Sequence, residues 1–239
     1  MSLSQPSLRR IGLFLFWAGI LLAAALAALQ TWADIEAISY GFPNVGHERM
    51  RGLDCPILMS RDETAAIEIT LKNTTDQLVR PLVRAMVSAP GLARWREVAQ
   101  SVPLQPGDRQ TVAWEVGADD IVLNNFILVK GYTFAAYPMA NTEGTCGSFV
   151  VNIGGVSGTV LYGLWLAVSV VLILSGLLLS RDRKAAVHQR AGRSPVRLAI
   201  AVAAAAGLAG AHLAMWVVSV LALVVMLFLI PMLLMVGEK

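Results

Sequence analysis

Hydrophobic and polar positions follow two different patterns along the chain. Residues 11–29, 158–179 and 198–236 contain no Asp, Glu, Lys or Arg. Between the first two of these runs, over residues 55–157, apolar and polar side chains tend to alternate one by one. A stretch of roughly 20 apolar residues crosses a bilayer core as a helix, whereas alternation with a period of two is typical of half-buried β-strands. The pattern therefore predicts membrane helices on both sides of one β-rich domain.

The lengths of the apolar runs predict how often the chain crosses a membrane. The first two runs each match one helix. The third, as a single helix, would extend about 58 Å, against a hydrocarbon core of about 30 Å. We therefore expect four transmembrane spans, the last two forming a hairpin that turns near residues 210–216; one bent helix projecting from the bilayer is the alternative. The first run exceeds the roughly 7–15 apolar residues of a signal peptide, so we expect it to remain as an anchor.

The most basic stretch of the chain lies between the second and third apolar runs. Lys and Arg accumulate in cytoplasmic loops beside membrane spans, so we expect this loop and both chain ends in the cytoplasm and residues 31–157 outside, in a bacterial envelope. Contact with a partner or with anionic lipid is the alternative role of the loop. The residues that carry this topology signal are Arg181, Arg183, Lys184, Arg190, Arg193 and Arg197.

Composition narrows the classes of function. Hydrophobic residues make up 56% of the chain and charged residues 15%, with a formal net charge of +3, whereas ordinary soluble domains carry about 25% charged residues. Because the excess positive charge lies beside apolar runs, it indicates membrane topology rather than nucleic-acid binding. We expect membrane lipids and other integral membrane subunits as partners, no nucleic acid and no cofactor.

The β-rich region predicts seven or eight short strands. In AAIEITLK, for example, Ile67, Ile69 and Leu71 alternate with polar residues, and NTTD, APG and QPGD supply turns between strands. This is the pattern of an antiparallel β-sandwich of about 100 residues. The predicted organisation is an anchor at 1–30, an extended linker at 31–54, a sandwich at 55–157, a span at 158–180, a basic loop at 181–197 and a transmembrane hairpin at 198–236.

Part of the strand pattern resembles a known group of modules. The segments IEITLKNTTD, VSAPGL and SVPLQPGDRQTVAWEV, within about residues 60–116, are similar to the immunoglobulin-like modules of bacterial envelope proteins of the CARDB and NEW3 type. In that group an Asn-rich turn follows an early strand, and a P-G-D/E turn precedes a strand of the form T-V-x-x-x-V. The resemblance implies an extracytoplasmic β-sandwich that binds, spaces or braces and shares no catalytic residues with its relatives.

The two cysteines, Cys55 and Cys146, lie near the start and the end of the strand-rich region. Disulfides persist in oxidising compartments, and a bond closing a loop of about 90 residues is expected to stabilise the fold by roughly 4–5 kcal/mol. A metal or redox site is the alternative, but the sequence has no CxxC motif and no histidine near Cys146. We therefore predict a structural disulfide.

The sequence carries no recognisable catalytic constellation. His47, His188 and His212 fall in three different segments, and neither a phosphate-binding loop nor a nucleophile elbow is present. We therefore do not expect an enzyme. A lipid-directed enzyme or transporter is an alternative that requires Asp34, Glu36 and His47 to converge under the sandwich.

Two polar groups in the predicted turns have a second interpretation. Asp119 and Asp120, together with Asn124 and Asn125, are a candidate cation site, but the interpretation we favour is a solvated turn. Asn73 begins an N-x-T glycosylation sequon, which the bacterial-looking architecture makes an unlikely acceptor.

The third apolar run carries a helix-packing pattern. Ala203 and Gly207, and likewise Ala206 and Gly210, stand four residues apart, and small residues at this spacing let membrane helices approach closely. The face they form packs either against the other spans of the chain or against a second subunit.

These features together favour a non-catalytic accessory or structural subunit of a bacterial membrane complex. Its spans pack on partner helices, and its sandwich caps the outer face of the complex. The candidate partner contacts, if they share one face, are Arg80, Arg84, Arg94 and Arg96. A free-standing envelope binding module or receptor is the alternative, and it predicts an exposed groove or apolar patch on the sandwich.

Overall fold

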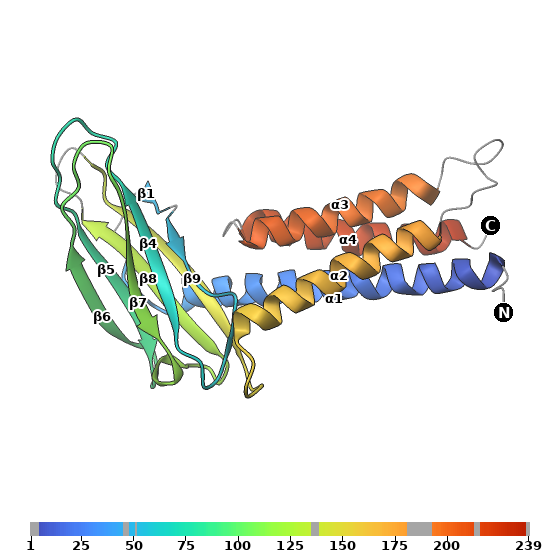
Figure 1. The fold of residues 1–239 in the computed structure, drawn as a ribbon, viewed down its shortest axis with the longest axis horizontal. Coiled ribbons are helices and arrows are strands. Elements are labelled where there is room, and N and C mark those ends of the chain that lie inside the picture. Colours follow the sequence, from blue (N-terminus) through green and yellow to red (C-terminus); the bar gives the residue numbers. More distant parts are fainter. Residues whose placement is uncertain are drawn as a thin grey trace. The chain divides into compact units, whose positions relative to one another are not determined.

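The computed structural model describes residues 5–44, 48–50, 52–134, 139–180, 193–212 and 216–237. It divides into two compact units, one formed by Met1–Thr31 with Tyr162–Lys239 and the other by Trp32–Leu161. The elements, labelled in Figure 1, are α1 (Gln5–Ser39), β1 (Glu48–Arg49), β2 (Leu53–Asp54), β3 (Leu58–Ser60), β4 (Ala65–Lys72), β5 (Leu82–Ala89), β6 (Arg94–Ser101), β7 (Arg109–Val116), η1 (Ala118–Asp120), β8 (Phe126–Phe134), β9 (Thr142–Val151), α2 (Gly158–Leu179), α3 (Arg193–His212) and α4 (Trp216–Gly237).

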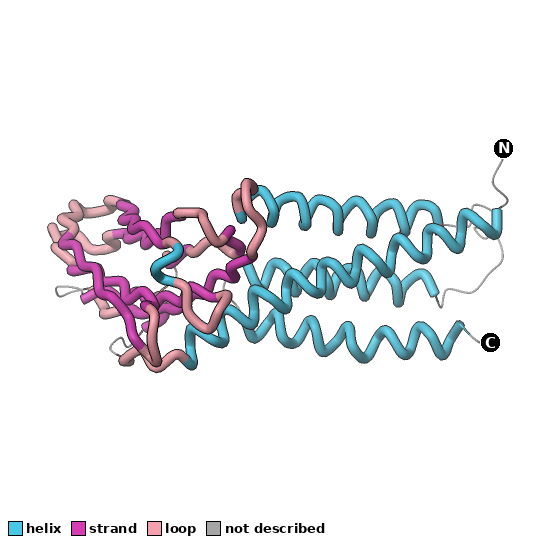
Figure 2. Tube along the Cα trace, turned by 90° about the horizontal axis from the view of Figure 1, so that it is seen from below, coloured by secondary structure: helices cyan, strands magenta, loops and turns pink. Residues whose placement is uncertain are grey.

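The second unit is a β-sandwich of two sheets. The larger sheet has the strand order β1-β9-β8-β5-β6, with β3 also paired to β9, and the smaller has the order β2-β4-β7. Most neighbours are antiparallel, but β1 and β3 both run parallel to β9. Figure 2 shows the strands and the loops that join them, coloured by secondary structure. The predicted immunoglobulin-like β-sandwich is confirmed in this unit.

The core between the sheets is built from the alternation seen in the sequence. Ile67 and its alternate neighbours in β4 are buried, while the polar residues between them are exposed or half-buried. Strand β8 differs, because both of its faces are covered. Ile127 and Val129 pack in the core with Ile67, whereas Phe126 and Leu128 belong to a separate cluster on the outer face of the larger sheet.

The prediction of an extended linker over residues 31–54 is wrong. Helix α1 continues to Ser39, and Gly41, with φ +93°, adopts the left-handed conformation that commonly follows a helix end. Strands β1 and β2 then enter the two sheets. The helical part of this segment presents the small residues Ala33 and Ala37 to the sheet, together with Trp32 and Asp34.

Those small residues let the end of α1 lie directly on the larger sheet. Ala33 and Ala37 are fully buried in the outer cluster with β8. A Cβ atom added to Gly147 of β9 would overlap the carbonyl oxygen of Ala33, so the helix and strand backbones meet without a side chain between them. The backbone N–H of Gly147 also donates to Oδ1 of the buried Asp34, at 3.3 Å.

The predicted disulfide is present. Cys55, just after β2, is bonded to Cys146 of β9, with a Cα–Cα distance of 6.1 Å. Cys146 is buried in the core, opposite Val129 in the β8–β9 register. The bond therefore joins the smaller sheet to the centre of the larger one.

In the helical unit, α1 and α2 pack closely through glycines. A Cβ atom added to Gly12 would lie 2.8 Å from the Cβ of Leu179, and one added to Gly19 would lie 2.8 Å from the backbone nitrogen of Ile173. The indole N–H of Trp165 donates to the carbonyl oxygen of Leu22 at 3.0 Å. Glycine at these positions allows the two helix backbones to approach.

Helices α3 and α4 meet through the small residues that the sequence singled out. A Cβ atom added to Gly207 would lie 3.4 Å from the Cβ of Ala222, and one added to Gly210 would lie 3.0 Å from the backbone nitrogen of Ser219. Ala203 is partly buried at the core of the unit, whereas Ala206 is exposed. Helix α4 of the same chain therefore covers this face at Gly207 and Gly210.

Two buried hydrogen bonds join α1 to the last two helices. Nε2 of Gln30 donates to the carbonyl oxygen of Ala211, and Oγ1 of Thr31 donates to Oγ of Ser219, both at 2.8 Å. Apolar surroundings raise the cost of leaving such groups unpaired. These bonds therefore fix how α1 lies against α3 and α4 within this unit.

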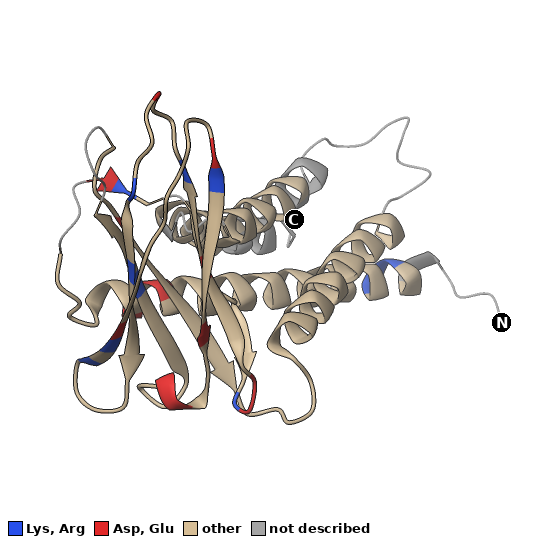
Figure 3. Ribbon diagram, turned by 60° about the vertical axis from the view of Figure 1, so that its left-hand side comes forward, with Lys and Arg blue, Asp and Glu red and all other residues tan. Residues whose placement is uncertain are grey.

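The four-span prediction is wrong. Among the described residues only α1 and α2 contain helices long and apolar enough to cross a membrane. The apolar run 198–236 divides between α3 and α4, and its apolar helical stretches, Leu198–His212 and Val217–Leu229, are each shorter than a bilayer requires. The chain is a mixed protein of four helices and two sheets in its described parts. Figure 3 shows its charged residues mainly on the sandwich; α2 and α4 contain none.

Candidate functional site

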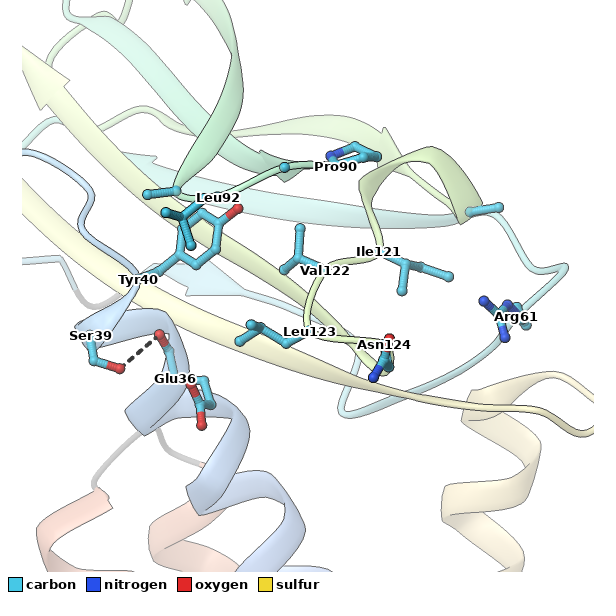
Figure 4. Close-up of a pocket in the computed structure, with 13 residues that line it drawn as sticks. Glu36, Ser39, Tyr40, Arg61, Pro90, Leu92, Ile121, Val122, Leu123 and Asn124 are labelled. Carbon is cyan, nitrogen blue, oxygen red and sulfur yellow. Dashed lines mark hydrogen bonds between the residues drawn. The ribbon is translucent and has the colours of Figure 1, made fainter.

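A pocket of about 510 Å³ opens on the sandwich unit. Four segments that are far apart in the sequence line it: the end of α1, the turn after β3, the β5–β6 turn, and η1 with the segment that follows it (Figure 4). Pockets of about 300–1,000 Å³ that combine apolar walls with a few polar groups are typical ligand or partner sites. The lining residues used below are Glu36, Tyr40, Arg61, Leu92, Ile121, Val122, Leu123 and Asn124.

The first wall is the four-residue turn between β5 and β6. The strand ends are paired at Ala89 and Arg94, and Gly91 and Ala93 both have positive φ, at +120° and +47°. A left-handed conformation costs a residue with a Cβ roughly 1–2 kcal/mol. This tight turn holds Leu92 outward, where 97% of its side chain is exposed.

The second wall is the turn between η1 and β8. Val122 and Phe126 exchange two backbone hydrogen bonds, of 2.7 and 3.0 Å, and so close a short loop. Within it Leu123 and Asn124 adopt positive φ values of 49° and 71°. Asn tolerates this conformation, but Leu rarely adopts it. Leu123 is nevertheless 56% exposed, so no apolar burial explains the strain.

An ion pair between the buried Asp120 and the partly exposed Arg96 anchors the second wall. The carboxylate of Asp120 accepts hydrogen bonds from Nε and Nη2 of Arg96, at 2.6 and 3.0 Å, and from the backbone N–H of Gly117 at 3.0 Å. Oγ of Ser88 donates to the carbonyl oxygen of Asp120 and accepts from the backbone N–H of Leu128. These contacts fix η1 against β5, β6 and β8, and therefore fix the loop that follows it.

Tyr40 ties the end of α1 to the first wall. Its hydroxyl donates to the carbonyl oxygen of Arg94 at 2.8 Å, and its ring packs on Phe42, which in turn contacts Trp95. Burial raises the pKa of the Tyr40 phenol above its ordinary value of 10.0, so the hydroxyl remains a donor at neutral pH. The end of α1 and the two walls are thus connected by hydrogen bonds and ring contacts.

The two charged residues of the pocket lie at its opposite ends (Figure 4). Glu36, on α1, accepts a 2.8 Å hydrogen bond from the indole N–H of Trp32 at one carboxylate oxygen. Arg61, in the turn after β3, is held by a backbone bond to Val151, and its guanidinium has no ion pair within the described part of the chain. Glu63 braces this turn by accepting hydrogen bonds from two backbone N–H groups.

The side chains proposed for catalysis or metal binding do not meet in this pocket within the described part of the chain. Within the described residues, no group of three His, Cys, Asp or Glu side chains is placed to hold a metal ion. Asp34 is engaged with β9 and Glu36 with Trp32, while His47 lies outside the described residues. Apolar side chains exposed around a pre-formed hollow are instead typical of protein interaction sites.

The structure does not gather the four predicted arginines on one face. Val87 lies opposite Arg96 in the β5–β6 register and faces the core. Arg96 therefore lies on the same side of the sheet as Val87. Arg84 is three residues from Val87 on the same strand, so it points to the opposite side, where it pairs with Glu97 at 2.8 Å and stacks over Phe134. Arg80 and Arg94 are exposed.

The other predicted sites are placed as follows. Arg181, Arg183, Lys184 and Arg190 lie outside the described residues, and Arg193 and Arg197 belong to the first turns of α3. The amide of the sequon residue Asn73 is buried, where it donates to the carbonyl oxygens of Gln77 and Leu104. It is therefore closed to glycosylation in the folded chain.

Sequence reasoning missed the pocket. APG was recognised as a turn, but the exposed Leu92 that follows it was not given a role. Asn124 and Asn125 were interpreted as part of a cation site or a solvated turn, and Leu123 beside them was not given a role. An isolated Leu inside each turn was the only local sign of the site.

No family model matches the chain, and no curated protein matches it. Among solved structures it is similar to a CARDB domain of a Pyrococcus furiosus protein in complex with di-metal ions, at 14% identity over 42% of this chain and 90% of that one, with a TM-score of 0.34. Further likenesses are to a Paenibacillus cycloisomaltooligosaccharide glucanotransferase (13% identity, 46% of this chain, TM-score 0.34) and a Listeria innocua β-glucosidase (16%, 41%, TM-score 0.31).

The chain spans only 15% of the length of each of these two enzymes. At such identities the likeness concerns the fold of the sandwich alone. One of these structures is a CARDB domain, the group that residues 60–116 resemble, but a TM-score of 0.34 carries no conclusion about this chain. No activity, substrate or metal is carried over to this chain.

Proposed function

We propose that this chain is a non-catalytic accessory component of a membrane complex. Helices α1 and α2 anchor it in the bilayer, and the β-sandwich recognises another protein through the pocket described above. The observation that carries the proposal is the pair Leu92 and Leu123. Both leucines are held outward at the pocket on turns that contain positive φ angles, and strain of this kind tends to persist at binding sites.

The composition of α1 and α2 supports the anchoring part of the proposal. The run 11–29 of α1 and the whole of α2 lack charged residues. In α2 several large apolar side chains are exposed, including Leu164, Val171, Leu174 and Leu178, and lipid covers such surfaces without cost. The basic residues after α2 favour a cytoplasmic position for that loop, which places the sandwich and its disulfide in the oxidising compartment.

Affinity capture of the full chain from its native membrane tests this proposal. The wild type, released in mild detergent and captured by a C-terminal tag, should carry a stoichiometric companion visible by native mass spectrometry. Leu92→Ser should lose that companion, because burying a serine side chain does not supply the free energy that burying the apolar leucine does. Leu78→Ser is the matched control: Leu78 is 48% exposed on the same unit but does not line the pocket.

The same pocket also fits the second candidate, a free-standing binding module or receptor. That function predicts an exposed groove or apolar patch on the sandwich, which the pocket provides. The two functions differ in their companions. If the wild-type chain appears alone in native mass spectra, at 25.6 kDa, it is not a subunit of a stable complex. The receptor function is then the one that remains.

A further inference from the structure

The two ends of the pocket carry opposite charges. Glu36 comes from α1 at one end, and Arg61 comes from the β3–β4 turn at the other (Figure 4). Both are exposed or half-buried side chains whose backbones are fixed, Glu36 within a helix and Arg61 by its bond to Val151. A ligand that lies along the pocket therefore meets a negative charge first and a positive charge last.

Between the two charges, aliphatic side chains line the pocket together with Ser39, Tyr40 and Asn124. Ile121, Val122 and Leu123 follow one another along the second wall, and Leu92 stands across from them on the first wall. An apolar group placed here removes the exposed side chains of Leu92 and Leu123 from water, at about 25 cal/mol per Å² of apolar surface. The pocket thus presents an acidic end, an apolar middle and a basic end.

The separation of the two charges bears on the chemistry of the occupant. A zwitterionic lipid headgroup holds its opposite charges within a few bonds, which does not match charges at the two ends of a pocket of about 510 Å³. An extended peptide spaces its side chains by about 3.3 Å per residue, so it can present a basic, an apolar and an acidic residue in turn. Loops at the ends of β-sandwiches commonly bind such segments.

We propose that the pocket binds a segment of a partner protein in which a large apolar side chain lies between a basic residue at the Glu36 end and an acidic residue at the Arg61 end. This rests on the proposed function, and it adds the chemical class and the orientation of the segment. The apolar residue supplies most of the affinity, and the two charges set the direction, because charged groups at the rim of an interface govern specificity more than strength.

Selection from a library of displayed random peptides of about twelve residues tests the proposal with the tagged full chain in detergent micelles. The wild type should enrich peptides with basic, apolar and acidic residues in one consistent order along the chain. Leu92→Ser should bind these peptides at least about tenfold more weakly, and Leu78→Ser should bind them as the wild type does.

A charge-swapped variant, Glu36→Lys with Arg61→Glu, tests the proposed orientation of the segment directly. It should prefer peptides of the reversed order by about tenfold over the original ones. Glu36→Gln is its folding control, since the amide oxygen still accepts the indole N–H of Trp32 while the charge is removed; it should weaken selection for the basic residue alone.

The outcomes separate this proposal from the proposed function. If the enriched peptides lack the charge pattern but their binding depends on Leu92, the proposed orientation of the segment is wrong. The pocket is then still a binding site. If a companion is captured from membranes in a Leu92-dependent way but no peptide is enriched above background, the occupant is not a linear segment. The proposed function as a complex component then stands. Peptides that bind Leu92→Ser and the wild type equally contradict both.

Discussion

The guanidinium of Arg96 forks onto the buried carboxylate of Asp120, with Nε 2.6 Å from Oδ1 and Nη2 3.0 Å from Oδ2. The same Nη2 also donates to the carbonyl oxygen of Glu115 in β7. One side chain of an edge strand of the larger sheet therefore fastens both η1 and the smaller sheet. Through η1 it sets the position of the turn that carries Leu123.

Replacing Arg96 by Met should destabilise the sandwich by about 2 kcal/mol, because it leaves the buried Asp120 carboxylate without its charged donor. Chemical denaturation followed by tryptophan fluorescence measures the loss. The double variant Arg96→Met with Asp120→Asn should recover part of it, since no buried charge then remains unpaired. A double variant less stable than the sum of the single ones contradicts a direct interaction.

Removing the disulfide by Cys55→Ala and Cys146→Ala should cost about 2–5 kcal/mol, because the bond closes a loop with a sequence separation of 91 residues. Thermal unfolding of the full chain in detergent, with and without a reductant, provides the measurement. The reductant should lower the midpoint of the wild type toward that of the variant and leave the variant unchanged. Equal midpoints for the two oxidised proteins would rule out a stabilising bond.

Gly147→Ala should destabilise the sandwich unit by about 1–3 kcal/mol or more, the usual cost of overpacking. The added methyl group overlaps the backbone carbonyl of Ala33, and neither backbone can move without disturbing the pairing of β9 or the last turns of α1. Gly154→Ala is the matched control, because a Cβ atom at Gly154 meets nothing within 4 Å. If both variants unfold at the same denaturant concentration, the helix does not rest on this strand.

Leu123→Asn should stabilise the sandwich by about 0.5–1 kcal/mol, since Asn adopts a left-handed conformation more readily than Leu. The same change should weaken capture of the companion, because an apolar contact is lost. Denaturation midpoints and capture yield are read on the same preparations. A variant that gains stability and keeps its companion would show that the strain at Leu123 serves no binding role.

The sequence predicted the parts of the fold that depend on local pattern. The alternation of Ile67, Ile69 and Leu71 determines which face of β4 is buried. The chain has only two cysteines, so only one intramolecular disulfide can form. Sequence reasoning failed where tertiary contacts decide. Asp120 was interpreted as part of a solvated turn, although it is buried and paired with Arg96, 24 residues away.

The helical regions show the same limit. Ala33 is small enough for α1 to continue onto the sheet, but only the glycine facing it, Gly147, makes that contact possible, and the two are more than a hundred residues apart. The run 198–236 was counted as apolar length for two spans. Two helices are present there, α3 and α4, and they pack on each other through Gly207 and Gly210, but within the described residues neither contains an apolar stretch long enough for a span.

The central claim, that the pocket is where the sandwich meets its partner, is tested most directly by photo-crosslinking in intact membranes. A photoreactive phenylalanine analogue is placed at position 92, 123 or, as control, 78 of the full-length chain. The account predicts an adduct to one and the same companion from positions 92 and 123, and none from 78. Adducts of equal yield from all three positions, or none from 92 and 123, would contradict it.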